Sequence, residues 1–230
     1  MTFSVVGRCA TTGQTGAAIS SSSPAVAARC AWVRGGVGAA TTQNVTDPRL
    51  GPALLDALAS GLSAPQAVDA VVESQPPELA AWRQLTAVDS SGGTAAFTGS
   101  RALGVHAQVV RPGVVVAGNL LSAPQVLTTA ADAFDANDHL PLGERLLLAL
   151  QAALDAGGEA GPVHSAGLLV AASDPVCSWP VTDLRVDHDD EPVRRLLDLW
   201  RLWAPQAEAY VARALAPDES PGYRVAGDDR

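Results

Sequence analysis

Lysine is absent from this chain of 230 residues, so all fifteen of its basic side chains other than histidine are arginines. A Schiff base, an attached pyridoxal phosphate and a Walker-type phosphate loop each need a lysine amine, and the composition excludes these three chemistries. A GC-rich genome, which favours arginine codons, is the simplest reason for the bias. The exclusion holds whatever the reason, and any side-chain cation in a functional site is expected to be an arginine.

Cysteine, long apolar runs and positive charge are also scarce. The three cysteines cannot all pair within one chain, and no basic segment followed by an apolar stretch begins the sequence, so we expect reduced thiols and a cytoplasmic location. No stretch approaches the roughly 18 apolar residues of a membrane span, which predicts no membrane partner. A net charge of −9, without a cluster of arginines and aromatics, also makes nucleic acid an unexpected partner.

Metal-ligand spacings are missing as well. The four histidines and three cysteines form neither a CxxC pair nor an HExxH motif, which argues against zinc. A cysteine nucleophile with a remote histidine stays open, although buried structural thiols are more common. The acidic run 187–191 carries carboxylates for a hard cation, but it lacks a spaced metal loop and better fits the start of a helix at Pro192. We expect neither a metal nor another cofactor.

The hydrophobic periodicity predicts an alternation of strands and helical pairs. Strands are expected at 2–8, 16–20, 31–33, 36–42, 85–89, 94–98, 105–109, 114–117 and 166–171, and helices at about 48–58, 64–72, 124–134, 142–154 and 192–214. This order predicts an α+β fold in which two sheets are covered by segregated helices, as in a four-layer αββα sandwich. We expect one domain over residues 1–215 and a polar, proline-bearing, disordered tail over 216–230.

The second residue is the most informative candidate for chemistry. Methionine aminopeptidase removes Met1 when the next residue is small, which would expose Thr2 as the N-terminus of a strand. Thr2 would then carry a hydroxyl nucleophile and an α-amine, which titrates near pH ~7.7–8.0 and could accept the hydroxyl proton. Most proteins that begin with Met-Thr use the threonine for nothing, so other features must support this interpretation.

Six segments support a family resemblance. They are TFSVVGR from Thr2, GVGAATTQNVTDPRLG ending at Gly51, WRQLTAVD from Trp82, AAFTG from Ala95, GNLL from Gly118 and LRVDHDDEPVRRLLDLW from Leu184. Together they resemble a bacterial family catalogued as domain of unknown function 1028, over about nine-tenths of the chain. That family is similar to the N-terminal-nucleophile (Ntn) hydrolases, so the resemblance implies an Ntn-hydrolase-like αββα sandwich whose nucleophile begins the first strand.

The resemblance implies acyl transfer at Thr2. Thr2 Oγ1 would attack an amide carbonyl, its own amine would carry the proton, and backbone N–H groups or a side-chain amide would hold the oxyanion. Ser21 falls where the family also tends to have serine, on the strand beside Thr2. The next residue is often lysine in the family but is Ser22 here, so Arg34 or Arg8 would have to supply the charge, or the activity differs or is absent.

Strand positions suggest further site residues, each with a structural alternative. Ser4 shares the face of Thr2 and could orient the amine, or it is an ordinary strand serine. Asn119 ends a strand and could donate to the oxyanion, or it caps a turn. The remaining candidates are possible substrate contacts that could equally hold loops, and they are Thr41, Thr42, Gln43 and Asn44 at one strand end and Arg83 and Gln84 before another.

Two classes of function follow from these residues. The first is a cytoplasmic Ntn-type amidohydrolase that acts on a small amide or modified amino acid, and the second is a catalytically silent sandwich that binds a small molecule or assembles into a larger complex. An intact Thr2 favours the enzyme, and the missing lysine favours the binder. The apolar face of the last helix, with Trp200 and Trp203, is expected to pack in the core but could also form a contact between copies in a homo-oligomer.

Overall fold

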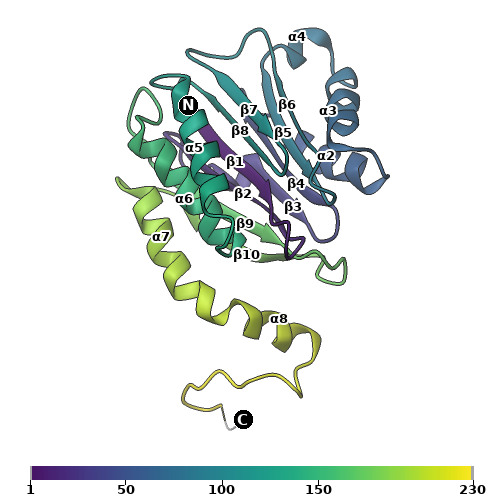
Figure 1. Ribbon diagram of the computed structural model, residues 1–230, viewed down its shortest axis with the longest axis vertical. Helices are drawn as coiled ribbons and strands as arrows, with labels where there is room; N and C mark the ends of the chain where they lie inside the picture. The colour runs from purple at the N-terminus through teal and green to yellow at the C-terminus, as the bar shows by residue number, and fades with distance from the viewer. Residues whose placement is uncertain (1, 229–230) are drawn as a thin grey trace.

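Two antiparallel sheets lie face to face between two helical layers (Figure 1). The computed structural model describes residues 2–228. The larger sheet has the order β10-β9-β2-β1-β8-β7. Its strands are β1 (Thr2–Arg8), β2 (Thr15–Ser21), β7 (Ala107–Arg111), β8 (Val114–Asn119), β9 (Ser165–Ala171) and β10 (Pro180–Val186). The smaller sheet, in the order β3-β4-β5-β6, contains β3 (Ala31–Arg34), β4 (Gly38–Asn44), β5 (Arg83–Asp89) and β6 (Thr94–Thr98). The predicted four-layer αββα sandwich is confirmed.

Helices α5 (Gln125–Ala136), α6 (Leu142–Asp155) and α7 (Pro192–Trp203) cover the outer face of the larger sheet. Strand alternation explains this packing, because Phe3 and Val5 of β1 point toward these helices and lie fully buried among their leucines. Trp200 belongs to the same core, and Trp203 Nε1 donates to Thr182 Oγ1 of β10 at 2.9 Å. Both tryptophans therefore contact elements of their own chain.

Helices α2 (Leu50–Ala59) and α3 (Ala64–Glu73) cover the smaller sheet and contribute Leu54, Leu58 and Val68 to its core. The two-helix pattern was predicted. Gly61, with φ of +95°, makes the turn between them, and Ser63 and Gln66 form a capping box at the start of α3. Two single-turn helices, α1 (Ala27–Cys30) and α4 (Pro77–Ala80), were not predicted.

The space between the sheets changes from apolar to polar along its length. One part is filled by Val6, Ile19, Val88, Val115 and Leu169. At the end where β1 begins, the same inward faces of β1, β4 and β5 present fully buried polar side chains, which are Ser4, Thr41, Gln43, Gln84 and Thr86. Since buried polar groups are costly unless they are hydrogen-bonded, this end of the sandwich needs an explanation in terms of partners or function.

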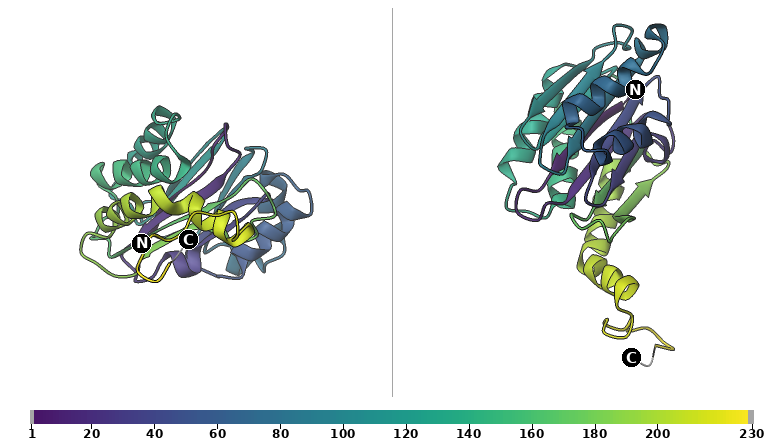
Figure 2. Two further views of the ribbon diagram at one scale, coloured as in Figure 1. Left: turned by 90° about the horizontal axis from the view of Figure 1, so that it is seen from below. Right: turned by 90° about the vertical axis from the view of Figure 1, so that its right-hand side faces the viewer.

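The C-terminal part differs from the prediction of one helix over 192–214. Pro205 interrupts that helix with a 3₁₀ turn, η1 (Ala204–Gln206), and α8 (Ala207–Leu215) follows. Figure 2 shows α8 and the chain beyond it extending away from the sandwich. Strand β10, at the sheet edge, was not predicted either, although its exposed Asp183 and Arg185 alternate with the more buried Thr182, Leu184 and Val186. Among residues 2–228, no helix is long and apolar enough to cross a membrane.

Candidate functional site

The site is built around Thr2, the first residue of the central strand β1. In the sheet, Thr2 pairs with Asn119 of β8, and its Oγ1 donates to Ser21 Oγ of β2 at 3.3 Å. Ser4 lies on the same inward face. Thr2 is 6% exposed and Ser21 is fully buried, so the hydroxyl pair lies at the edge of the polar region between the sheets.

Gln84 of β5 organises the buried polar groups. Its Nε2 donates to two carbonyls, Gly118 O at 3.0 Å and Ala107 O at 3.3 Å, which can only accept. Its Oε1 must therefore face the amides of its neighbours, and it accepts from Gln43 Nε2 at 2.7 Å and from Asn119 Nδ2 at 3.1 Å. The main-chain carbonyls thus fix the orientation of every amide in the network.

This orientation decides what Ser4 and Asn119 offer to the site. Gln43 Oε1 faces Ser4 and accepts a hydrogen bond from its hydroxyl group at 2.8 Å. Ser4 Oγ therefore keeps lone pairs with which it can accept a hydrogen bond. Asn119 uses one Nδ2 hydrogen on Gln84, which leaves one further N–H. Its Oδ1 is buried without a partner, although the residue is only 1% exposed. Asn119 was predicted as an oxyanion donor, and the structure adds an unsatisfied acceptor on the same side chain.

Glu159, which the sequence interpretation did not select, also reaches this end of the sandwich. It lies in the loop between α6 and β9, is 4% exposed, and accepts from the Ser22 amide through Oε2 at 3.3 Å. Its Oε1 is buried without a partner. Burial raises the pKa of the Glu159 carboxyl to about 7, although the hydrogen bond from Ser22 opposes this shift.

The predicted contacts Thr42 and Asn44 belong to the opposite face of β4 from Gln43. Thr42 Oγ1 donates to Asp47 O at 3.3 Å. Asn44 has a φ of +72°, donates to Trp82 O and accepts from the Leu103 amide at 3.1 Å. These bonds hold the loops at this end of the smaller sheet, which was the structural alternative for both residues.

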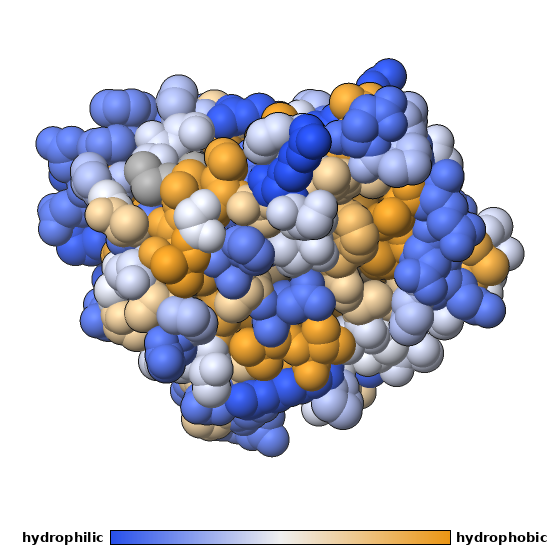
Figure 3. Space-filling model, turned by 90° about the horizontal axis from the view of Figure 1, so that it is seen from above, coloured by the Kyte–Doolittle hydropathy of each residue, from blue (hydrophilic) through white to orange (hydrophobic). Residues whose placement is uncertain are grey.

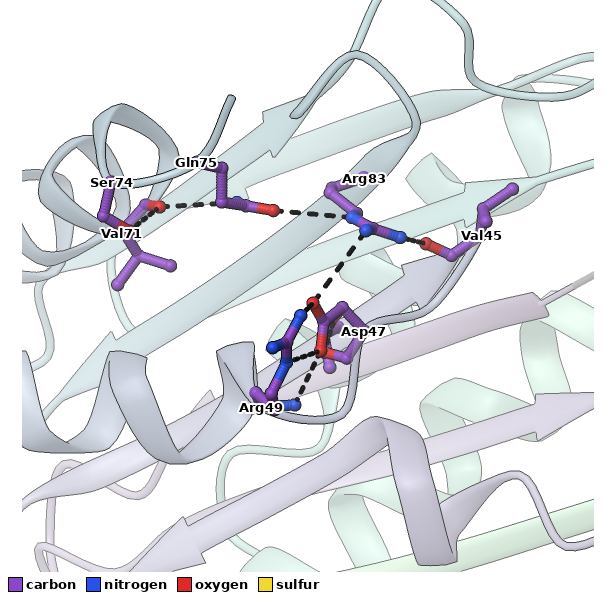
Figure 4. A network of polar contacts seen from close by, with 8 residues as sticks. Val45, Asp47, Arg49, Val71, Ser74, Gln75 and Arg83 are labelled. Carbon is purple, nitrogen blue, oxygen red and sulfur yellow. Dashed lines mark hydrogen bonds and ion pairs between the residues drawn. The ribbon is translucent and has the colours of Figure 1, made fainter. Parts of the chain in front are cut away.

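Arg83 also holds a loop (Figure 4). Its guanidinium donates to Val45 O at 2.6 Å and to Gln75 Oε1 at 3.4 Å, and it lies 3.9 Å from Asp47 Oδ2. Arg49 pairs with the same carboxylate at 2.7 Å and holds the pKa of Asp47 below its usual range. With its side chain 10% exposed and directed at protein partners, Arg83 joins the segment after β4 to the segment after α3.

The arginines considered as replacements for the missing lysine lie elsewhere. Arg34 ends β3, pairs with Asp56 of α2 at 2.8 Å and is not brought to Thr2. Arg8 is at the far end of β1, where its Nε donates to Ser90 O at 2.8 Å. Ser22, at the lysine position, contributes its backbone amide to Glu159. The side chain that Ser22 contacts, one residue after the hydroxyl partner of Thr2, is thus the buried acid Glu159.

The outer surface at this end mixes apolar and polar side chains (Figure 3). Val45, Leu103 and Val105, in the segments that follow β4 and precede β7, are each about two-fifths exposed. A cavity of about 530 Å³ lies elsewhere, between α6, α7, α8 and β10, and is lined by Leu142, Trp200 and other residues outside the site. Among the described residues, no three His, Cys, Asp or Glu side chains are grouped as metal ligands.

Sequence reasoning missed the roles of Gln84 and Glu159 for different reasons. The strand was expected from residue 85, but β5 begins at Arg83, so Gln84 is an inward strand residue rather than a loop residue. The alternation with Thr86 was the signal that could have revealed this. Glu159 lies among glycines in GGEAG, a pattern typical of an exposed loop, and carries no local sign of burial.

Comparison with known proteins gives a matching family and several similar solved structures. The profile of a family described as "Family of unknown function (DUF1028)" matches residues 2–196. Protein SPO2555 from Silicibacter pomeroyi, a DUF1028 protein, is 32% identical with a TM-score of 0.80, covering 88% of this chain and 86% of that chain. Anbu (ancestral beta-subunit) from Yersinia bercovieri is 11% identical with a TM-score of 0.41, covering 92% and 97%. Anbu from Hyphomicrobium sp. strain MC1 is 13% identical with a TM-score of 0.40, covering 90% and 97%. No curated protein matches the sequence.

Proposed function

This chain belongs to the DUF1028 family, and we propose that it is an Ntn-type amidohydrolase that cleaves the amide C–N bond of a small molecule through an acyl ester on Thr2. The observation that supports this proposal best is the environment of Thr2. Thr2 is 6% exposed at the start of the central strand, and its hydroxyl is hydrogen-bonded to Ser21. The αββα sandwich with a threonine at this position is the arrangement that Ntn hydrolases use.

The reaction would begin with attack of Thr2 Oγ1 on the carbonyl carbon of the substrate. The hydroxyl proton moves to the α-amine of Thr2, which exists only after removal of Met1, a residue outside the described range. The C–N bond then breaks, and the proton passes from the ammonium group to the leaving nitrogen. Water hydrolyses the acyl ester, releases the acid and restores the hydroxyl.

The neighbouring residues have distinct roles in this scheme. Ser21 accepts from the Thr2 hydroxyl and sets its orientation. The Nδ2 hydrogen of Asn119 that Gln84 does not use would donate to the oxyanion. Ser4 offers its oxygen as an acceptor to the α-ammonium group, because its proton is committed to Gln43.

A silent binding protein of the same fold is the second candidate. Two observations favour it, namely the serine at position 22 where relatives often have lysine and the placement of Arg34 and Arg8 away from Thr2. Retention of Met1 in the mature protein would also favour it, since a blocked amine cannot act as the base.

The test is the intact mass of the purified protein before and after incubation with a threonine-directed β-lactone. We expect loss of Met1 and a single adduct that maps to Thr2, because the lactone carbonyl takes the place of the amide carbonyl. Thr2→Ala should lose Met1 but form no adduct, whereas Thr11→Ala, which removes an exposed hydroxyl at the far end of the strand pair, should react like the wild type. Retained Met1 without an adduct would contradict the hydrolase mechanism and leave the binding protein as the better explanation.

A further inference from the structure

Glu159 connects the ends of β2 and β8, the two strands that flank Thr2. Its side chain accepts from Ser22, the residue after the hydroxyl partner of Thr2 on β2. Its backbone forms an isolated bridge with Leu121, two residues beyond the ladder partner of Thr2 on β8. Glu159 is thus attached to the ends of β2 and β8, the strands on either side of β1. Its carboxylate lies beyond Thr2, the first residue of β1, on the side where the α-amine of a processed Thr2 would be.

The loop that carries Glu159 is firmly attached at this position. Ser122 N donates to Gly158 O at 3.0 Å, and Ala160 N donates to Leu120 O at 2.9 Å. Gly157 and Gly158 adopt φ values of +115° and +52°, and the left-handed region favours glycine at both positions. The backbone on either side of Glu159 is therefore hydrogen-bonded to the segment after β8, and the carboxylate has a defined position.

The surroundings leave Glu159 short of hydrogen-bond donors. Among residues 2–228, no cation pairs with it, and Oε1 is buried without a partner. Two neighbouring titratable side chains are directed at other groups. The His164 ring stacks on His188 at 5.4 Å and lies 3.8 Å from the Asp190 carboxylate, and Asp155 at the end of α6 accepts from Gln151. A second orphaned acceptor, Asn119 Oδ1, is present on the other side of Thr2.

We infer that Glu159 is a positioning residue for the catalytic amine and holds the α-ammonium group of processed Thr2 through its unpaired Oε1. This inference rests on the proposed function. An ammonium group supplies three N–H donors, which match the unpaired oxygens of Glu159 and Asn119 and the lone pairs of Ser4. The carboxylate stabilises the positive charge that forms when the amine takes the Thr2 hydroxyl proton.

Glu159 also brings to the amine a charge opposite to that of the missing lysine. A lysine near the amine would lower the pKa of the amine, whereas a carboxylate raises it and makes the amine a stronger base. Burial raises the pKa of Glu159 to about 7, so its carboxyl is mostly ionised at the pH where an α-amine, with a usual pKa near ~7.7–8.0, titrates, and it can stabilise the ammonium form there. The same burial ensures that the interaction is weakly screened by salt.

The first experiment measures the pKa of the Thr2 amine in Glu159→Gln and in the wild type. Each chain is prepared with Thr2 as its first residue, by cleavage of an N-terminal fusion if Met1 is retained, and is labelled with ¹³C-threonine so that the Thr2 Cα shift reports the titration of the unmodified amine by NMR. We expect the amine pKa to fall by about 1 unit in Glu159→Gln, because an opposite charge within hydrogen-bonding reach is lost. Asp155→Asn, which removes a nearby exposed carboxylate, should leave it unchanged. An unchanged pKa in Glu159→Gln would overturn the inference, whether or not the protein is an enzyme.

The second experiment follows the rate of β-lactone acylation against pH. In Glu159→Gln we expect the alkaline plateau to fall by about 10- to 100-fold and the midpoint to move to lower pH, because the amine is a weaker base and its charged form is no longer stabilised. Glu159→Asp should recover part of the plateau. A lower plateau with an unshifted midpoint would mean that Glu159 has only a structural role. Absence of acylation in the wild type, together with a shifted amine pKa, would contradict the proposed function and keep the positioning role.

Discussion

At the scale of single residues, Glu159 destabilises the fold at the pH where it would act. A carboxyl whose folded pKa is about 7, against a usual value of 4.5, binds a proton more readily in the folded chain than in the unfolded chain. Stability therefore falls as the pH rises from about 4.5 to 7, and the loss is complete above that range. A buried acid that lowers stability is easier to understand as a functional group than as part of the core.

The change Glu159→Gln should therefore stabilise the protein at alkaline pH. At pH 10, where the Thr2 amine is neutral, the wild type has an ionised, buried carboxylate without a cation and the variant has a neutral amide, so we expect a gain in the free energy of unfolding on the order of 3 kcal/mol. At pH 5 the gain should nearly vanish, since the wild-type carboxyl is then protonated in the folded state. Urea unfolding at both pH values measures the difference, with Asp155→Asn as the exposed control. An equal effect at the two pH values would show that ionisation is not the cause.

At the scale of elements, the packing of α2 on β3 depends on a glycine at the start of the helix. Gly51 is buried, and a Cβ at this position would overlap the Trp32 ring. Helix propensity alone predicts that Gly51→Ala stabilises the protein by up to about 1 kcal/mol. Close packing predicts the opposite, because the ring or the helix must move, and overpacking typically costs about 1–3 kcal/mol.

We expect Gly51→Ala to lower the free energy of unfolding by about 1–2 kcal/mol, as measured by urea denaturation. The same substitution in a Trp32→Leu background removes the overlap and should be neutral or stabilising. A stabilising effect of Gly51→Ala in the wild-type background would mean that α2 shifts freely on the sheet. Such freedom would be important for the site, because α2 follows the loop that Arg83 and Asp47 connect to β5.

The element scale also shows what the sequence could predict. Strands with buried faces and the two helical pairs followed from periodicity, because every second or every third to fourth residue is apolar. Strand β10 did not, since an edge strand has few residues that must be apolar. In the site, Thr2 and Ser4 share a face by strand alternation, as the local pattern predicts, whereas Ser21 was selected through the family resemblance and carries no local signal of its own. The Gln84 network and Glu159 depend on contacts between segments far apart in the chain, which no local pattern contains.

At the scale of the whole molecule, burial is concentrated in the four layers and ends before the C-terminus. The cores formed by the two sheets and their helices extend to Trp200, and the family match ends at residue 196. From residue 201 to 228 no residue is buried. Trp203 still packs against the core and donates to Thr182, and the contacts of the last segment include exposed ones such as Arg213 over the Tyr223 ring at 4.1 Å.

A chain that ends at Leu215 should therefore fold and react like the full chain. Deletion of 216–230 removes the contacts of the Tyr223 ring with Arg213 and Tyr210, which are worth about 0.5–1 kcal/mol each, so we expect the free energy of unfolding to fall by no more than about 2 kcal/mol. Acylation of Thr2 should be unchanged, because the site lies among β1, β2, β8 and the loop of Glu159, all formed by earlier residues. Urea unfolding and β-lactone labelling of the two chains measure both quantities. A large loss of stability would mean that the last segment belongs to the domain, and a loss of labelling alone would mean that it reaches the site.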